Sequence, residues 1–126
     1  MDLKRKRIEI QKLIRNYAPK DTEFYWHNDT RDSVGLCKAK YCSKNKVFYD
    51  YEIAISYKFA TSHSWEEVRM VAIQEIAHAR TLGKKLPVWI KEYKHLKSII
   101  DKKEKSQSPK TENKAEKAPG NSPGVN

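Results

Sequence analysis

The segment "SHSWEEVRMVAIQEIAHARTL", residues 62–82, constrains the fold of this chain more than any other. Ser64 and Glu67 have the spacing of a capping box, in which the serine accepts from a free backbone amide and the glutamate reaches back to the cap. A helix is therefore expected to begin at Trp65. Apolar residues line one side of this helix and much of the rest, namely Val68, Val71, Ala72, Ile76 and Ala79, then Met70, Ile73, Ala77 and Leu82. Such a helix is mostly buried, and 126 residues allow one domain with a small core.

The remaining elements can be assigned from periodicity. Residues 3–17 have apolar positions at helical spacing, and Pro19 closes the segment. Three runs rich in aromatic and β-branched residues follow, "EFYWHN", "VGLCKAKYC" and "VFYDYEIAIS", separated by the turn-like stretches "DTRDS" and "SKNK". They predict a small meander of three antiparallel strands. Pro87 suits the first turn of a last helix that continues to Ile100, so the fold class is α+β in a domain of residues 1–100.

Residues 101–126 contain Lys, Glu, Ser, Pro, Asn and Gly with almost nothing to bury, which predicts a disordered basic tail. No apolar run approaches the roughly 20 residues that cross a bilayer, and no signal-peptide segment follows the charged N-terminus. We therefore expect an intracellular protein with no membrane partner, in which Cys37 and Cys42 stay as thiols. Small size and heavy use of lysine would also suit a viral or phage protein.

Within the central helix, Gln74-Glu75-Ile76-Ala77-His78 differs by one residue from the zinc-protease signature H-E-x-x-H. In that signature, two side chains at i and i+4 project from one side of a helix and reach one metal ion, while the glutamate activates a water molecule. Gln74 and His78 occupy the two ligand positions, and Glu75 occupies that of the general base. The amide oxygen of glutamine is a weak zinc ligand, and a buried helix with an ordinary core histidine is the alternative interpretation.

The order of the surrounding features resembles the SprT-like family, the minimal zinc-protease domains related to Spartan, from about Asp21 to Ile99. The resemblance depends on a glycine and a cysteine in an early strand, a strand ending in "IAIS", and the motif helix. The corresponding residues are Gly35, Cys37, Ile53, Ile55, Ser56, Glu67, Val68 and "QEIAHA". It implies a zincin architecture with an N-terminal helix, a small sheet, the motif helix and a C-terminal helix. It also implies association with DNA, where Spartan-type members cleave crosslinked proteins.

The resemblance also implies a third ligand histidine in a segment similar to H-G-P-x-W. Here that segment is "KLPVW", so Lys85 stands at the vacated third-ligand position. Two of the three ligand positions, those of Gln74 and Lys85, are thus altered, and we expect no cofactor unless the site still binds zinc through His78. A protonated lysine cannot coordinate a cation. We therefore expect the Lys85 ammonium to pair with Glu75 and to compensate its buried charge.

The balance of 26 basic and 16 acidic side chains gives a formal charge of +10, which favours an anionic partner such as DNA. The candidate phosphate contacts are lysines and arginines near the N-terminus, in the strands, in the turns and in the last helix, namely Lys4, Arg5, Lys6, Arg7, Lys38, Lys40, Lys44, Lys46, Lys84, Lys91 and Lys94. Aromatic residues between them either stack on unpaired bases or fill the core.

Three functions follow from these observations. The first is a catalytically degenerate protease-fold module that binds DNA or a DNA-associated protein. The second is a working zinc-dependent peptidase in which Glu75 is the general base and Gln74 and His78 hold the metal. The third is a small regulatory module that binds another protein through the vacated cleft.

Overall fold

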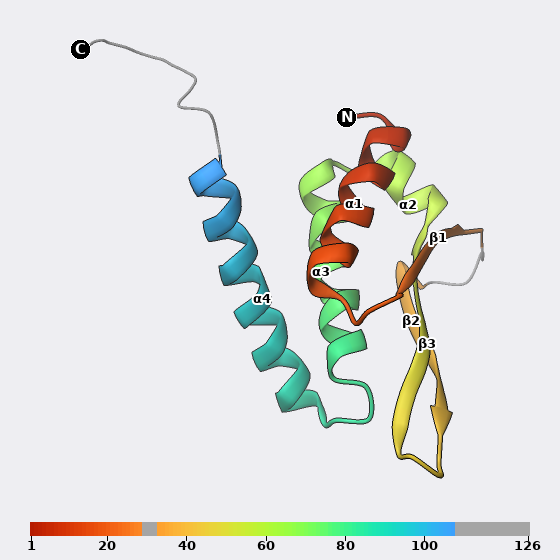
Figure 1. The fold of residues 1–126 in the computed structure, drawn as a ribbon. Helices are drawn as coiled ribbons and strands as arrows, with labels where there is room; N and C mark the ends of the chain where they lie inside the picture. The colour runs from red at the N-terminus through yellow and green to blue at the C-terminus, as the bar shows by residue number, and fades with distance from the viewer. Residues whose placement is uncertain (29–32, 108–126) are drawn as a thin grey trace. The chain divides into compact units, whose positions relative to one another are not determined.

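The computed structural model describes residues 1–28 and 33–107 and divides into two compact units, Met1–Leu96 and Lys97–Asn126. Its elements, labelled in Figure 1, are four helices and a three-stranded sheet, which confirms the α+β class. In chain order they are α1 (Leu3–Tyr17), β1 (Glu23–His27), β2 (Gly35–Cys42), β3 (Val47–Ser56), α2 (Tyr57–Ser62), α3 (Trp65–Arg80) and α4 (Leu86–Gln107).

The sheet has the strand order β1-β3-β2. Strands β2 and β3 are antiparallel, as predicted, with Cys37 opposite Ile53. Strand β1, however, lies on the other edge of β3 and runs parallel to it, with Phe24 beside Ile53. The prediction of an all-antiparallel meander is therefore wrong. The predicted turn "DTRDS" lies almost wholly outside the described residues. The connection that contains it spans residues 28–34 and exceeds the loop of about two to five residues that makes a hairpin.

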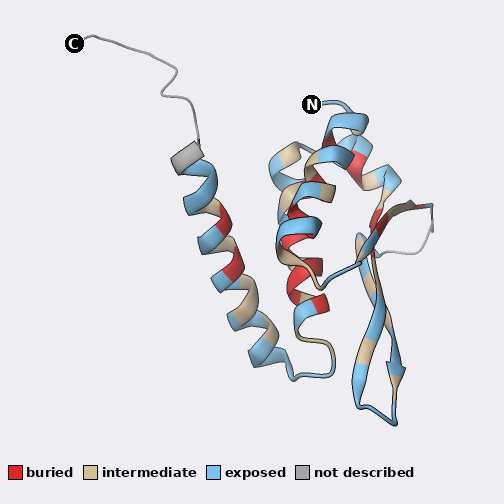
Figure 2. Cartoon of the chain, in the orientation of Figure 1, coloured by how far each residue is buried: buried red, intermediate tan, exposed pale blue. Residues whose placement is uncertain are grey.

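Helices α1 and α3 lie on the same side of the sheet, and their buried residues face each other and the strands (Figures 1 and 2). The core joins Ile53 and Ile55 of β3 to one stripe from each helix. From α1 this stripe is Ile10, Leu13 and Ile14, and from α3 it is Val68, Ala72, Ile73 and Ile76. Away from the helices, the tip of the β2–β3 hairpin is exposed (Figure 2).

The two helices predicted with most detail are confirmed. Helix α1 spans residues 3–17, and the Asp2 side chain caps it by accepting from the Arg5 amide at 2.8 Å. Helix α3 begins at Trp65 behind a complete capping box. The Ser64 amide donates to the Glu67 carboxylate at 3.0 Å, and the Glu67 amide donates to Ser64 Oγ at 3.3 Å.

Two helical segments differ from the prediction. The short helix α2 was not expected, and it begins where Ser56, at the end of β3, accepts from the Phe59 amide at 3.2 Å. Helix α4 continues to Gln107 and so includes the first part of the segment predicted to be a tail. The rest of that segment, residues 108–126, lies outside the described residues. Over residues 1–28 and 33–107, no helix combines the length and the apolar character that a membrane span requires.

Candidate functional site

The Glu75 side chain is buried between α3 and the edge strand β2. Gly35 makes this close approach possible, because a Cβ atom at that position would lie 2.7 Å from Glu75 Oε2 and 2.8 Å from Val71 Cγ1. Real Cβ atoms do not come this close to other heavy atoms, so only glycine fits at this position in the observed backbone. The motif glutamate therefore faces the strand that carries Gly35 and Cys37.

Burial dominates the electrostatics of this pair. It raises the pKa of the Glu75 carboxyl to about 7, because the charged form loses its hydration. It also raises the pKa of the Cys37 thiol to about 12, and the nearby Glu75 charge adds to that shift. Cys37 is consequently a neutral thiol at physiological pH, whereas Glu75 changes charge there.

The predicted ion pair between Lys85 and Glu75 is absent from the described part of the chain, and that prediction is wrong. The Lys85 side chain is exposed, while its backbone carbonyl accepts from the Val88 and Trp89 amides at 3.0 and 3.4 Å. Lys85 thus stands at the start of α4, and its ammonium stays hydrated. Glu75 faces the sheet instead, with no opposite charge among the causes of its pKa shift.

Trp89, from the "KLPVW" segment, covers the other two motif residues. Its ring stacks on His78, with centroids 4.5 Å apart and planes 20° apart, and its Nε1–H donates to the Gln74 carbonyl at 3.3 Å. Burial lowers the pKa of His78, so this imidazole is neutral at physiological pH. Tyr93 continues the stack, 6.0 Å from Trp89. The first turns of α4 are therefore held against the end of α3.

This donor set does not fit a zinc ion. Of the three ligand positions implied by the resemblance, only that of His78 carries a strong zinc donor, since Gln74 offers a neutral amide and Lys85 offers a cation. Among the residues that the structure describes, no group of three or more His, Cys, Asp and Glu side chains could hold a metal ion.

Some of the predicted phosphate contacts already have protein partners. Lys6 is buried, and its Nζ donates to the carbonyls of Ala60 and His63 at 2.7 and 2.8 Å, so it satisfies the end of α2 and is unavailable to a phosphate. The prediction for Lys6 is wrong for this reason. Lys38 lies 3.6 Å from Glu52 and Lys40 lies 3.4 Å from Asp50. Both are exposed, so these pairs are weak and easily exchanged.

Other predicted contacts are exposed and lie in two regions of the first unit. Lys4, Arg5 and Arg7 belong to the first turns of α1, where Arg5 pairs with Glu9 at 3.1 Å. The hairpin tip, with Lys44 and Lys46, lies at the opposite end of this unit from those turns (Figure 1). The other exposed lysines are in the α3–α4 connection and in α4, namely Lys84, Lys91 and Lys94. The structure does not gather all the predicted contacts into one surface.

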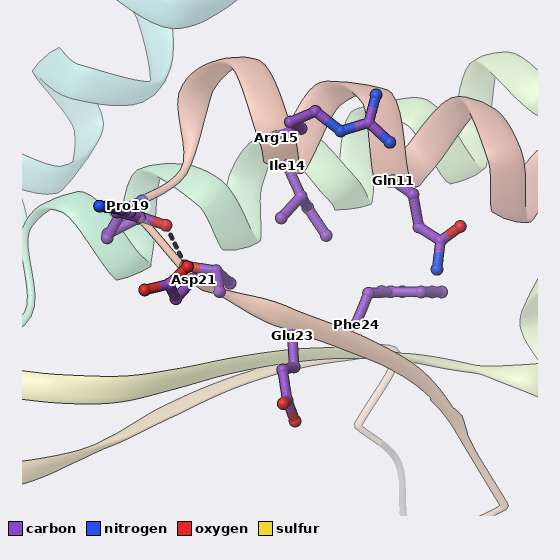
Figure 3. Close-up of a pocket in the computed structure, with 9 residues that line it drawn as sticks. Gln11, Ile14, Arg15, Pro19, Asp21, Glu23 and Phe24 are labelled. Carbon is purple, nitrogen blue, oxygen red and sulfur yellow. Dashed lines mark hydrogen bonds between the residues drawn. The ribbon is translucent and has the colours of Figure 1, made fainter.

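The sequence did not indicate a cavity of about 630 Å³ between α1, the α1–β1 connection and β1 (Figure 3). Gln11 and Ile14 point from α1 toward the strand, while Phe24 points from β1 toward the helix. Arg15 and Lys20 also line it. The only available signal was the spacing of Arg7, Gln11 and Arg15, four residues apart along one face of α1. Their proximity to β1 depends on the parallel pairing of that strand.

A comparison of this chain with protein-family models, with curated proteins and with solved structures found no match.

Proposed function

We propose that this chain is a catalytically degenerate SprT-like module that acts by binding DNA or a protein bound to DNA. The state of the motif is the observation that carries the proposal. Trp89 covers His78, Glu75 is buried with no cation beside it, and the third-ligand position carries an exposed lysine. One strong donor in three positions is too few for the zinc site of a peptidase. The order of helix, sheet, motif helix and last helix supports the zincin architecture in this proposal.

The partner is proposed from charge. A formal charge of +10 draws polyanions over long range, and exposed lysines in the hairpin tip and α4 are free to contact phosphates. Such contacts bind without reading sequence, because they reach only the backbone of the nucleic acid. A protein associated with DNA is the other proposed partner, and it would meet the same basic surface indirectly.

The test is DNA binding measured by fluorescence anisotropy in the presence of a chelator, over a series of KCl concentrations. We expect binding that weakens steeply with salt and that is unchanged by Glu75→Gln, since the motif takes no part. Reversing the charge of Lys44 and Lys46 should weaken it, whereas reversing Lys12 serves as a matched control on another surface. Binding that disappears with the chelator or with Glu75→Gln would contradict the proposal.

A working peptidase is the second candidate, and one observation favours it. The pKa of Glu75, raised to about 7, lies where a general base is effective, and the lowered pKa of His78 keeps its imidazole free of a proton. The discriminating measurement is metal content by mass spectrometry after zinc is offered to the wild type and to His78→Ala. One zinc per chain in the wild type, lost in the variant, would favour this candidate over the degenerate module.

A further inference from the structure

We propose that the groove between α1 and β1 binds an unpaired nucleotide of a single-stranded nucleic acid. This inference rests on the nucleic-acid part of the proposed function and assigns to it a site and a substrate class. The site is the cavity of about 630 Å³ in Figure 3, which is within the range of about 300 to 1,000 Å³ that small-ligand pockets occupy. It lies in the first unit and shares no residue with the motif of α3.

The centre of the groove has the chemistry that a nucleobase requires. Ile14 and Phe24 offer apolar surface from opposite walls, and Pro19 closes one end. The Gln11 amide projects between these walls and has both a donor and an acceptor for the polar edge of a base. An apolar lining with a few converging polar groups is the usual composition of a ligand site.

Cations flank this centre on both sides along α1. The Arg7 guanidinium lies 5.9 Å from the centroid of the Phe24 ring, one helical turn before Gln11, and Arg15 follows one turn after it. Arg7 and Arg15 are therefore about 12 Å apart along the helix axis. Lys20 extends the series into the α1–β1 connection. Within residues 1–28 and 33–107, neither Arg15 nor Lys20 forms an ion pair.

The two carboxylates near the groove limit where a phosphate can lie. The Glu23 side chain points away from α1, toward the opposite face of the sheet (Figure 3). Asp21 lines the groove beside Pro19 and repels a phosphate at that end. The phosphates are therefore confined to the side of the groove that carries Arg7 and Arg15, while the base occupies the space over Phe24.

The width of the groove selects a single strand. A base enters a cavity between a helix and a strand only when its edge and faces are free, and both are engaged in a duplex. The duplex also presents its phosphates on a wide convex surface, which the exposed lysines elsewhere on the chain can meet. The groove should consequently add affinity for single strands over duplexes of the same length.

The experiment compares a fluorescent oligothymidylate with a duplex of equal length, using the full chain and a series of KCl concentrations. We expect the single strand to bind more tightly. Arg15→Ala combined with Lys20→Ala should weaken single-strand binding about three- to tenfold and lower the salt slope by about 0.7 for each cation removed. Gln11→Trp fills the cavity without changing charge and should remove the preference for the single strand. Asp21→Asn should tighten binding.

Lys12→Ala is the matched control, because Lys12 is an exposed cation of the same helix that pairs with Glu9 at 3.4 Å and does not line the groove. It should leave the single-strand preference unchanged. Equal affinity for single strand and duplex, or groove variants that behave like Lys12→Ala, would overturn the groove inference while leaving DNA binding intact. If the wild type binds neither nucleic acid, the DNA part of the proposed function fails as well. Each variant is first checked for a thermal transition equal to that of the wild type.

Discussion

At the scale of single residues, Gly35 determines how closely α3 approaches the sheet. A methyl group at this position would overlap Glu75 and Val71. We therefore expect Gly35→Ala to lower the free energy of unfolding by about 1 to 3 kcal/mol, the usual cost of overpacking. Denaturant titration measures it, and the second substitution Val71→Ala should recover part of the loss. Additive effects of the two substitutions would mean that the overlap is relieved in another way.

The burial of Glu75 makes the stability of the chain depend on pH. Its folded pKa, raised to about 7, exceeds the ordinary value of 4.5 that the unfolded chain should have, so the folded state retains the proton more strongly. Stability should therefore be highest below the unfolded pKa, fall as the pH rises from about 4.5 to about 7, and stay low above that. The loss is about 3 kcal/mol, since each pKa unit corresponds to about 1.4 kcal/mol. Unfolding of the wild type and Glu75→Gln at about pH 5 and about pH 8 tests this. Equal pH dependence in both proteins would contradict it.

At the scale of elements, Lys6 connects α1 to the end of α2. Replacing it by methionine keeps most of the volume but leaves the carbonyls of Ala60 and His63 without their donor. We expect Lys6→Met to lower the free energy of unfolding by about 1 to 3 kcal/mol, the cost of buried polar groups left unpaired. Lys4→Met, an exposed change in the same helix, is the control in a denaturant titration and should have little effect.

Trp89 connects the first turns of α4 to the end of α3. Its stacking on His78 excludes water from the imidazole, and burial is the cause of the lowered His78 pKa. We expect Trp89→Ala to return this pKa toward its ordinary value, as followed by NMR titration of the histidine ring. Tyr93→Phe keeps a ring beside Trp89 and should not change it. An unchanged pKa in Trp89→Ala would mean that other residues desolvate His78.

Local and long-range interactions explain which elements the sequence could predict. The bounds of α1 and the start of α3 were predictable, because caps and apolar spacing lie within the segment itself. The parallel pairing of β1 was not, since it joins Glu23 to Glu52 across the whole hairpin. The burial of Lys6 depends on α2, which at six residues is too short to show a period. At the candidate site, the motif residues were visible, but the stacking of Trp89 on His78 and the α1–β1 groove required the tertiary arrangement.

At the scale of the whole molecule, the donor set predicts independence from metal. Because only His78 among the motif's ligand positions is a strong zinc donor, prolonged treatment with a chelator should leave the melting temperature unchanged. Differential scanning calorimetry before and after treatment, and after adding zinc back, measures this. A melting temperature that falls with the chelator and recovers with zinc would show a bound metal that contributes to folding.

The strand order has a consequence for synthesis. The central strand of the sheet, β3, is the last of the three to be made, whereas α1 and β1 leave the ribosome first. Until residue 56 has emerged, β1 has no neighbour in the sheet, and α1 still lacks α2, to which Lys6 is bonded. The β2–β3 hairpin can form as soon as its residues are free, because its contacts are local. The growing chain therefore carries its most basic helix unfolded or exposed for the first half of its translation.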